Sequence, residues 1–382
     1  MKAQSPLDIQ ELLKLSLSFL AEHPKELSAC SLVAHSWVGA AQTILFRAPH
    51  LTNWSVVTTN RTALKLYDAL TASPHLARHV RALSLKQYTL SPSTESKILC
   101  QVGFHRLETL SLEIMNLPNW ADKVGALLRS PTLRNLELLG PGPFTRLVPS
   151  MANFSPTIRH LEIRCIRWDL IEPSVESRSL PPIHIESLYF RVFTPDVKDA
   201  ERLDAEALYP FVLDRLNYLA VWNTRSILWD TIPVSVKESI ETLQIKLRGS
   251  DLVDLSSFLQ LSVLHLILEP LQSVPPGFRY TLKTVSASHR IQTITIWIGH
   301  SKLCDDEEYE KLDEVLSSMP LNPTPMVEFE SSIKGEGEGR VDRLKSLFPK
   351  VVAKDKFRVA YLPWNIDDIG RGVLKEYAYF KR

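Results

Sequence analysis

The chain has 382 residues, of which 45% are hydrophobic and 23% are charged, and its formal net charge is +1. This is an ordinary globular composition, and the near-neutral charge argues against a nucleic-acid binder that relies on a dominant basic field. No apolar run reaches the roughly 18 residues of a membrane-spanning helix, so we expect no membrane segment. The four cysteines are far apart and form no CxxC pair, which suits a reducing intracellular compartment, cytoplasmic or nuclear, and predicts neither a metal site nor a disulfide framework.

Three short amphipathic helices are predicted in the first 50 residues. Apolar residues recur at three- and four-residue steps between residues 9 and 20, which is the spacing of one helical face. A second helix is predicted from Pro24, because proline fits the first position of a helix, and a third around Trp37. Helices of this size bury little apolar area, so we expect them to depend on the rest of the chain or on a partner.

The same 50 residues contain a distinctive set of motifs. These are SPLDIQELL from Ser5, SFLAEHPKELSACSLVAHSW from Ser18, and Leu45-Phe46. Over roughly residues 4–48 the sequence resembles the F-box, in the form common in fungal F-box proteins, and CSLV-x-x-SW is its most specific part. Ser5 departs from the family, which usually has Leu before the proline.

An F-box docks the small Skp-type adaptor of SCF ubiquitin ligases and, through that adaptor, a cullin. The resemblance therefore implies adaptor binding by apolar residues of the first helix and of the region between the second and third helices. The matching positions are Pro6, Leu7, Ile9, Leu32, Val33 and Trp37. The alternative is that these six residues form the core of a small helical domain.

From residue 80 onward one six-residue pattern recurs: apolar, two variable, apolar, one variable, apolar. Nine such hexads start 21 to 31 residues apart, close to the period of leucine-rich repeats. One short strand cannot bury its apolar face alone, so we predict that the hexads stack as a curved parallel sheet. Many leucine-rich repeats place Asn or Cys eight residues after each hexad start, where its side chain satisfies the backbone of the turn. Neither residue occurs at these positions here, which indicates irregular repeats. The hexads begin at Val80, Leu107, Leu133, Ile158, Ile185, Leu216, Ile240, Leu261 and Ile291.

The predicted fold class is therefore α/β. We expect an F-box-like helical domain over residues 1–50, an irregular leucine-rich-repeat solenoid of about nine repeats over 51–300, and a capping segment over 301–382. Helices are predicted at 61–72, 119–130, 199–211 and 305–319, and a strand from residue 326. The stretch KGEGEGR from Lys334 lacks the GK[ST] ending of a phosphate loop and is predicted to be a flexible loop.

Strand periodicity separates two faces of the predicted sheet. The fourth and sixth residues of each hexad should be buried, whereas the residues between and after them should be exposed on the concave face. Tyr, Trp and Arg often dominate interface energies, so the middle strands supply the candidate substrate-binding residues. In register, the three cations and Trp222 should form one row that suits an acidic or phosphorylated peptide, although Glu162 should pair with one arginine and scattered surface charge is the alternative. The candidates are Arg164, Tyr189, Arg191, Tyr218, Trp222 and Lys246.

No catalytic motif was found, and no cofactor is expected. The combined patterns predict a non-enzymatic substrate-recognition subunit of an SCF-type ubiquitin ligase, with an unknown protein substrate. The first alternative is a leucine-rich-repeat interaction scaffold whose N-terminal helices serve only as a cap. The second is an enzyme whose motif the sequence does not reveal.

Overall fold

The architecture is that of a computed structural model. Its residues fall into two compact units. Unit 1 comprises Met1–Gly142 and Arg146–Ile158, and unit 2 comprises Pro143–Thr145 and Arg159–Arg382. The domain boundaries predicted near residues 50 and 300 stay predictions. The described residues are 10–21, 23–49, 56–85, 102–113, 125–140, 154–165, 181–192, 211–222, 232–246, 252–268, 274, 276–298, 306–331 and 337–361.

Unit 1 begins with the three predicted helices, α1 (Gln10–Ser18), α2 (Pro24–Cys30) and α3 (His35–Leu45). They share a small apolar core of Leu13, Leu17, Leu27, Ala40 and Ala41. The helix α4 (Val56–Ala72) and the 3-10 helix η2 (Pro74–His79) follow and lead into the first hexad. Pro24 and Pro74 stand in the first turns of α2 and η2, where a missing N–H costs nothing.

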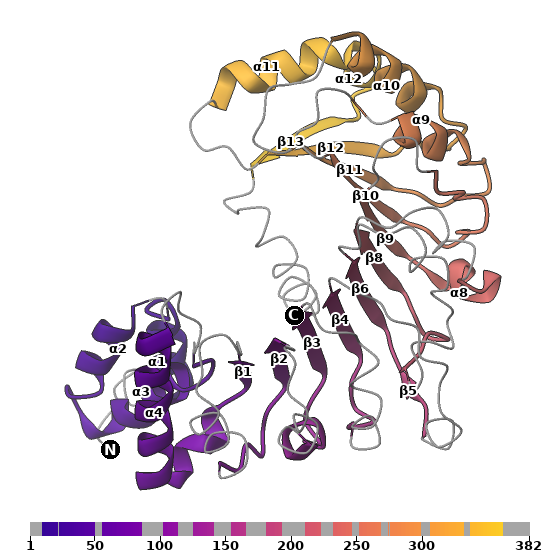
Figure 1. Cartoon of the computed structure of the whole chain (residues 1–382). Coiled ribbons are helices and arrows are strands. Elements are labelled where there is room, and N and C mark those ends of the chain that lie inside the picture. The colour runs from indigo at the N-terminus through magenta and orange to yellow at the C-terminus, as the bar shows by residue number, and fades with distance from the viewer. Residues whose placement is uncertain are drawn as a thin grey trace, which may run out of the picture. The chain divides into compact units, whose positions relative to one another are not determined.

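The hexads form parallel strands whose order in space follows their order in the sequence (Figure 1). Unit 1 carries β1 (Ala82–Leu85), β2 (Thr109–Glu113) and β3 (Asn135–Gly140). Two short segments, β5 (Ile183–His184) and β7 (Phe211–Val212), pair separately. Unit 2 carries β4 (His160–Cys165), β6 (Ser187–Val192), β8 (Tyr218–Trp222), β9 (Thr242–Lys246), β10 (Val263–Leu268), β11 (Thr293–Ile298), β12 (Met326–Ser331) and β13 (Phe357–Tyr361). This sequential parallel ladder confirms the α/β repeat fold.

The predicted register is confirmed by burial. The first residue of every hexad is buried, as are the fourth and sixth residues wherever their side chains are described. Leu136 and Leu138 in unit 1, and Leu161 and Ile163 in unit 2, are examples. A slip of one residue would expose all of them, so the hexads alone specify which face of each strand meets the core.

One hydrogen-bonding arrangement recurs between successive repeats. The backbone N–H groups of the second and third hexad residues both donate to the carbonyl of the second residue in the preceding hexad. Glu108 and Thr109 donate in this way to Arg81, at 2.7 and 2.9 Å. Arg81 and Ala82 donate to the carbonyl of Arg47, at 2.8 and 3.0 Å. The backbone of Arg47, just after α3, thus takes the place of a preceding repeat and caps the first strand.

Side-chain hydroxyl groups take over part of the role of the Asn residues that are absent from these repeats. The residue before a hexad donates from its side chain to the carbonyl of the first residue of the preceding hexad. Thr157 Oγ1 donates to Leu133 O at 2.7 Å, and Ser239 Oγ donates to Leu216 O at 2.7 Å. Backbone carbonyls at the turns are therefore satisfied by short side chains from the next repeat.

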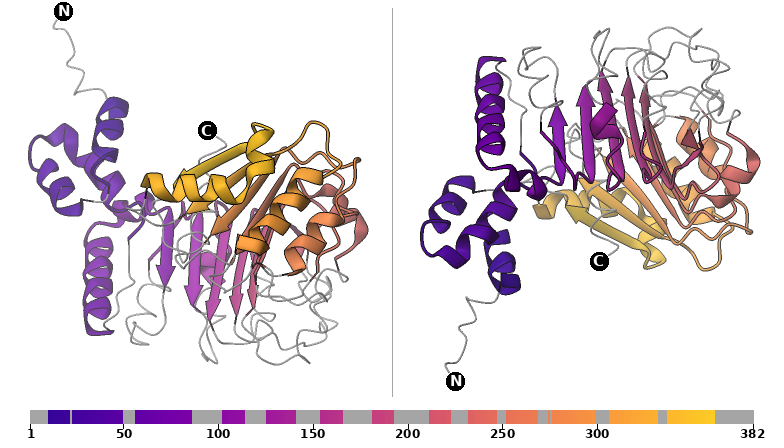
Figure 2. Two further views of the ribbon diagram at one scale, coloured as in Figure 1. Left: turned by 90° about the horizontal axis from the view of Figure 1, so that it is seen from above. Right: turned by 90° about the horizontal axis from the view of Figure 1, so that it is seen from below.

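The C-terminal part of unit 2 continues the sheet and covers one of its faces with helices. Helices α9 to α12 lie along the same side of strands β10–β13 (Figures 1 and 2). The predicted helix at 305–319 and the strand from 326 are confirmed as α10 and β12. The loop predicted at KGEGEGR is wrong from Gly337 onward, because α11 begins there. The helices of unit 2 are α8 (Val234–Ser239), α9 (Pro276–Lys283), α10 (Asp306–Ser318), α11 (Gly337–Leu347) and α12 (Pro349–Ala353).

The other predicted helices have mixed outcomes. The helix at 61–72 is confirmed within α4. Only residues 125–128 of the segment at 119–130 are described as helical. The segment at 199–210 lies outside the described residues, and Phe211 opens the short strand β7 rather than closing a helix.

A buried aspartate joins α10 to α12. Asp313 is 1% exposed, and its two carboxylate oxygens accept the backbone N–H groups of Lys350 and Val351, each at 3.0 Å. These N–H groups belong to the first turn of α12, where no intrahelical acceptor exists. The neighbouring Glu314 is exposed, and its carboxylate lies 3.5 Å from Lys350 Nζ.

Asp313→Ala should therefore lower the free energy of unfolding by about 1–3 kcal/mol, since two N–H groups lose their acceptor. Glu314→Ala should change it by only about 0–1 kcal/mol, as expected for an exposed ion pair. Urea denaturation followed by circular dichroism measures both. Equal effects of the two substitutions would contradict a capping role for Asp313.

Candidate functional site

The candidate binding surface is the face of the unit 2 sheet that points away from the helices. The strand register pairs Arg164 with Arg191, Arg191 with Trp222, and Trp222 with Lys246. Because paired residues of parallel strands lie about 4.8 Å apart, these four side chains form the predicted row. We call the surface the aromatic–cation face. It consists of Glu162, Arg164, Tyr189, Arg191, Tyr218, Ala220, Trp222, Gln244, Lys246, Ile267 and Trp297.

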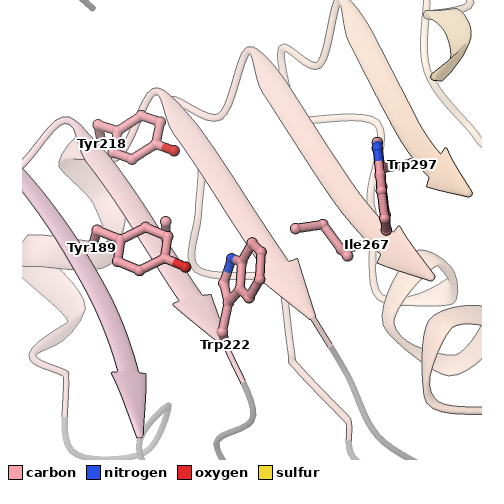
Figure 3. Close-up of a cluster of buried hydrophobic side chains, with 6 residues drawn as sticks. Tyr189, Tyr218, Trp222, Ile267 and Trp297 are labelled. Carbon is pink, nitrogen blue, oxygen red and sulfur yellow. The ribbon is translucent and has the colours of Figure 1, made fainter. Parts of the chain in front are cut away.

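Aromatic rings organise this face (Figure 3). The ring centroids of Tyr189 and Trp222 are 5.6 Å apart, and the ring planes are inclined by 55°. Arg191 Cζ and Lys246 Nζ each lie 5.0 Å from the Trp222 ring centroid, so this indole lies between two cations. Cation–π attraction holds the cationic groups in place against the ring.

The aromatic–cation face carries more positive than negative charge. Arg164, Arg191 and Lys246 contribute three positive charges, whereas Glu162 contributes one negative charge. Arg164 Nε donates to Glu162 Oε1, and Arg164 Cζ also lies 5.3 Å from the Tyr189 ring centroid. The predicted pairing of Glu162 with an arginine is therefore present. A net cationic, desolvated surface is complementary to ligands that carry acidic groups.

The predicted exposure of this face is wrong for its central residues. Tyr189 and Trp222 are 1% exposed, Tyr218 is 3% exposed and Lys246 is 5% exposed. Large rings on strands about 4.8 Å apart pack against one another, and the aliphatic stems of the cations lie across them. Neighbouring outward residues thus remove one another from water, which the alternation rule alone does not take into account.

Two indole donors on the face are buried. Trp222 Nε1 and Trp297 Nε1 are shielded from solvent and have no acceptor among the described residues. An indole N–H can only donate, and leaving a buried donor without an acceptor costs about 1–3 kcal/mol. Burial also raises the pKa of the Tyr189 phenol well above its ordinary value, so Tyr189 is a neutral phenol at physiological pH. The face therefore presents donors and cations, and a suitable ligand must supply acceptors.

Tyr218 differs from the other candidates. Its hydroxyl donates to Gln244 Oε1 at 2.8 Å, and both side chains are buried. This bond between β8 and β9 stabilises the face from within. Tyr218 is thus better placed to support the binding residues than to contact a ligand through its hydroxyl.

His265 lies in the same sheet face and was not selected from the sequence. It is paired in register with Gln244 on one side and Thr295 on the other. Burial lowers the pKa of His265 to about 4, because the imidazolium would lose its hydration there. Its fifth position in the hexad LSVLHL is the signal that would have placed it on this face.

The second candidate surface is formed by the N-terminal helices of unit 1. Leu32 is 87% exposed and Val33 is 67% exposed, in the turn between α2 and α3. Trp37 is partly buried and packs against the helical core, as the alternative interpretation expects. The remaining predicted adaptor-binding residues, Pro6, Leu7 and Ile9, lie outside the described residues.

Sequence analysis missed a second apolar face of α1. Leu12, Leu15 and Phe19 are exposed, and Phe19 alone is 81% exposed, whereas Leu13 and Leu17 face the core. Positions 12, 15 and 19 repeat at helical spacing, so they form their own stripe. The sequence signal for this face was a short helix with apolar residues on two sides. Packing against the helical core requires only one of those sides.

Other site classes find no support in the described part of the chain. Within it, no group of three or more His, Cys, Asp or Glu side chains could hold a metal ion. Among the same residues, no helix is long and apolar enough to cross a membrane.

The chain was also compared with known proteins. No protein-family model matches the chain, and no curated protein matches it. Among solved structures, it is similar to the leucine-rich repeat-containing protein LegL7 from Legionella pneumophila, with 15% sequence identity and a TM-score of 0.42. The likeness covers 79% of this chain and 97% of that one. The repeat architecture is therefore assigned from the strand order and register themselves.

The lowered pKa of His265 predicts a pH dependence of stability. Between about pH 6.5 and 4 the unfolded chain binds a proton at His265 and the folded chain does not, so stability falls as pH decreases through this window. His265→Gln should make that decline shallower, measured by urea denaturation at several pH values. Identical profiles for wild type and His265→Gln would contradict the assignment.

Proposed function

We propose that the chain is a substrate-recognition subunit of an SCF-type ubiquitin ligase. In this proposal the N-terminal helices dock a Skp-type adaptor, and the aromatic–cation face binds a protein segment rich in acidic groups. The chain itself performs no chemistry. It raises the effective concentration of its substrate near the ubiquitin-carrying enzyme by binding substrate and adaptor together.

The observation that carries the proposal is the exposure of Leu32 and Val33. Both side chains match F-box positions that contact the adaptor in that family, and both are largely in water in the single chain. The exposed stripe of α1 adds further apolar surface on the same small helical core. Apolar side chains gathered in this way are typical of protein interaction sites.

The aromatic–cation face supports the second half of the proposal. Tyr, Trp and Arg are the residue types that most often dominate binding energy, and all three occur there in adjacent strands. Cations fixed against rings bind carboxylates or phosphates with little loss of side-chain freedom. A protein segment with neighbouring acidic residues and apolar side chains fits this chemistry.

One observation favours the alternative scaffold without a ligase. The carbonyl of Arg47 accepts two N–H groups from the start of the first repeat, and Thr43 Oγ1 lies 3.3 Å from His79 Nδ1 in the same region. The helices are thus built into the repeat array as a cap. A cap and an adaptor-docking module are compatible, so adaptor binding decides between the two functions.

Leu32→Asp together with Val33→Asp should reduce binding of a purified Skp-type adaptor by roughly a thousandfold, because two apolar anchors of about 2 kcal/mol each would be lost. Pull-down and calorimetric titration measure this. Val234→Asp is the matched control, since Val234 is also exposed, at 58%, but lies in unit 2. Unchanged adaptor binding in the double variant, with the fold preserved by circular dichroism, would favour the scaffold.

Arg191→Gln together with Lys246→Gln should remove the substrate from affinity-purified complexes while adaptor binding persists. Both changes keep a polar side chain and remove the charges beside Trp222. Arg290→Gln is the control, because Arg290 is an exposed cation of unit 2 away from this face. Quantitative mass spectrometry of copurified proteins checks the outcome. An unaltered partner list would place substrate binding on another surface.

A further inference from the structure

Strand β13 is the last strand of the unit 2 sheet (Figure 1). Val327 on β12 pairs in register with Phe357, and Val327 N donates to the carbonyl of Lys356 at 2.8 Å. In a parallel ladder a residue bonds to the two residues that flank its partner, so Lys356 and Arg358 direct their backbone groups toward β12. The N–H and C=O groups of Phe357 and Val359 therefore point to the other edge of β13.

The outer edge of β13 offers free hydrogen-bonding groups. No described residue bonds to the backbone groups that Phe357 and Val359 direct away from β12. A strand edge of this kind is a template on which another extended chain can pair. Pairing through the backbone supplies hydrogen bonds, and the alternating side chains of the added strand decide which chain fits.

The apolar core is also incomplete at this edge. Val327 and Phe329 are 2% and 1% exposed, whereas their register partners Phe357 and Val359 are only partly buried. Phe357 nevertheless belongs to the core, because its ring centroid lies 5.1 Å from that of Phe329 and 6.4 Å from that of Phe348. A further strand about 4.8 Å from β13 would shield these side chains, as a following repeat does elsewhere in a solenoid.

We propose that β13 pairs antiparallel with β13 of a second copy of this chain, across a two-fold axis at Val359. In this dimer Val359 faces Val359 of the second copy, and Phe357 faces Tyr361 of the second copy. Each opposing pair exchanges two hydrogen bonds, because both members direct N–H and C=O groups to the edge. The contact uses the same surface on both copies, so it closes after two chains.

The chemistry of β13 fits a copy of itself in this register. The partly buried Val359 meets its own equivalent, so apolar side chains adjoin at the axis. Arg358 lies opposite Ala360 of the second copy and keeps its ion pair with Glu328 on β12, at 3.1 Å. The register in which Phe357 faces Val359 of the second copy would place the two arginines directly opposite each other, which is unfavourable. The register centred on Ala360 would leave Phe357 unpaired.

The dimer carries two aromatic–cation faces on one continuous sheet. A substrate with two acidic segments would bind both faces, and the second contact would form at high effective concentration. This consequence rests on the proposed function. The pairing itself depends only on β12 and β13.

A symmetric disulfide tests the register of the dimer. Residues of a hydrogen-bonded antiparallel pair have Cα atoms about 5.5 Å apart, which a disulfide can span. Two thiols at the axis pass two electrons and two protons to oxidised glutathione, which is reduced to two glutathione thiols as the disulfide forms. The full-length Val359→Cys variant should therefore become a covalent dimer in a glutathione buffer, with mass spectrometry locating the bond at position 359 of both chains.

Lys356→Cys is the matched control for cross-linking. Lys356 is also partly buried and precedes the same strand, but it lies three residues from the axis. Its two copies are roughly 20 Å apart in the dimer, which is too far for a disulfide. Equal cross-linking of the two variants, or the absence of a covalent Val359→Cys dimer, would overturn the proposal.

Sedimentation velocity of the full-length chain measures assembly without a cross-link. We expect the wild type to dimerise reversibly at high micromolar concentration. Val359→Pro should weaken dimerisation at least about tenfold, because each dimer loses two N–H donors while the bonds from β13 to β12 are kept. Val359→Ile keeps the N–H group and should dimerise like the wild type.

Two results of the sedimentation experiment would refute the dimer. One is a wild-type chain that stays monomeric throughout this concentration range. The other is undiminished dimerisation of Val359→Pro with an unchanged circular dichroism spectrum. None of these assays contains adaptor or substrate, so their failure leaves the proposed function to be judged by its own tests.

Discussion

The structure depends on one repeated constraint: in most of the described repeats, two successive N–H groups converge on a single carbonyl of the repeat before it. This arrangement fixes each strand start against its neighbour, and the parallel bonds of the strands then follow in register. Because side chains alternate with a period of two, register decides every exposed and buried position at once. The Arg47 carbonyl shows how such an array can begin. It supplies the acceptor that a previous repeat would have supplied, so the start of the first strand is capped.

The same constraint explains which features could be predicted from the sequence. Core positions such as Leu161 and Ile163 follow from hexad periodicity, and so does the row from Arg164 to Lys246, because both depend only on alternation and register. The hydroxyl ladder at Thr157 and Ser239 was not predicted, because it uses the residue before each hexad rather than the position where Asn is usual. The burial of Trp222 was not predicted either. It depends on the side chains of neighbouring strands that pack around it, which is a long-range property that no local pattern encodes.

Two physical demands meet on the aromatic–cation face. Rings from neighbouring strands exclude water, and this strengthens the electrostatic interactions of the cations near them. Exclusion of water also makes unpaired charges and donors costly, which applies to the indole N–H groups of Trp222 and Trp297. A face of this kind is stable when acceptors are supplied to it. Selectivity then follows, because a ligand that lacks acceptors would bury donors without pairing them.

A ligand for such a face must supply hydrogen-bond acceptors, because indole, guanidinium and ammonium groups can only donate. A single carboxylate supplies few acceptors, whereas several neighbouring acidic groups, or phosphate groups with three acceptor oxygens each, supply more. The proposed function therefore favours substrates whose negative charge is concentrated in one short segment over proteins with scattered acidic residues.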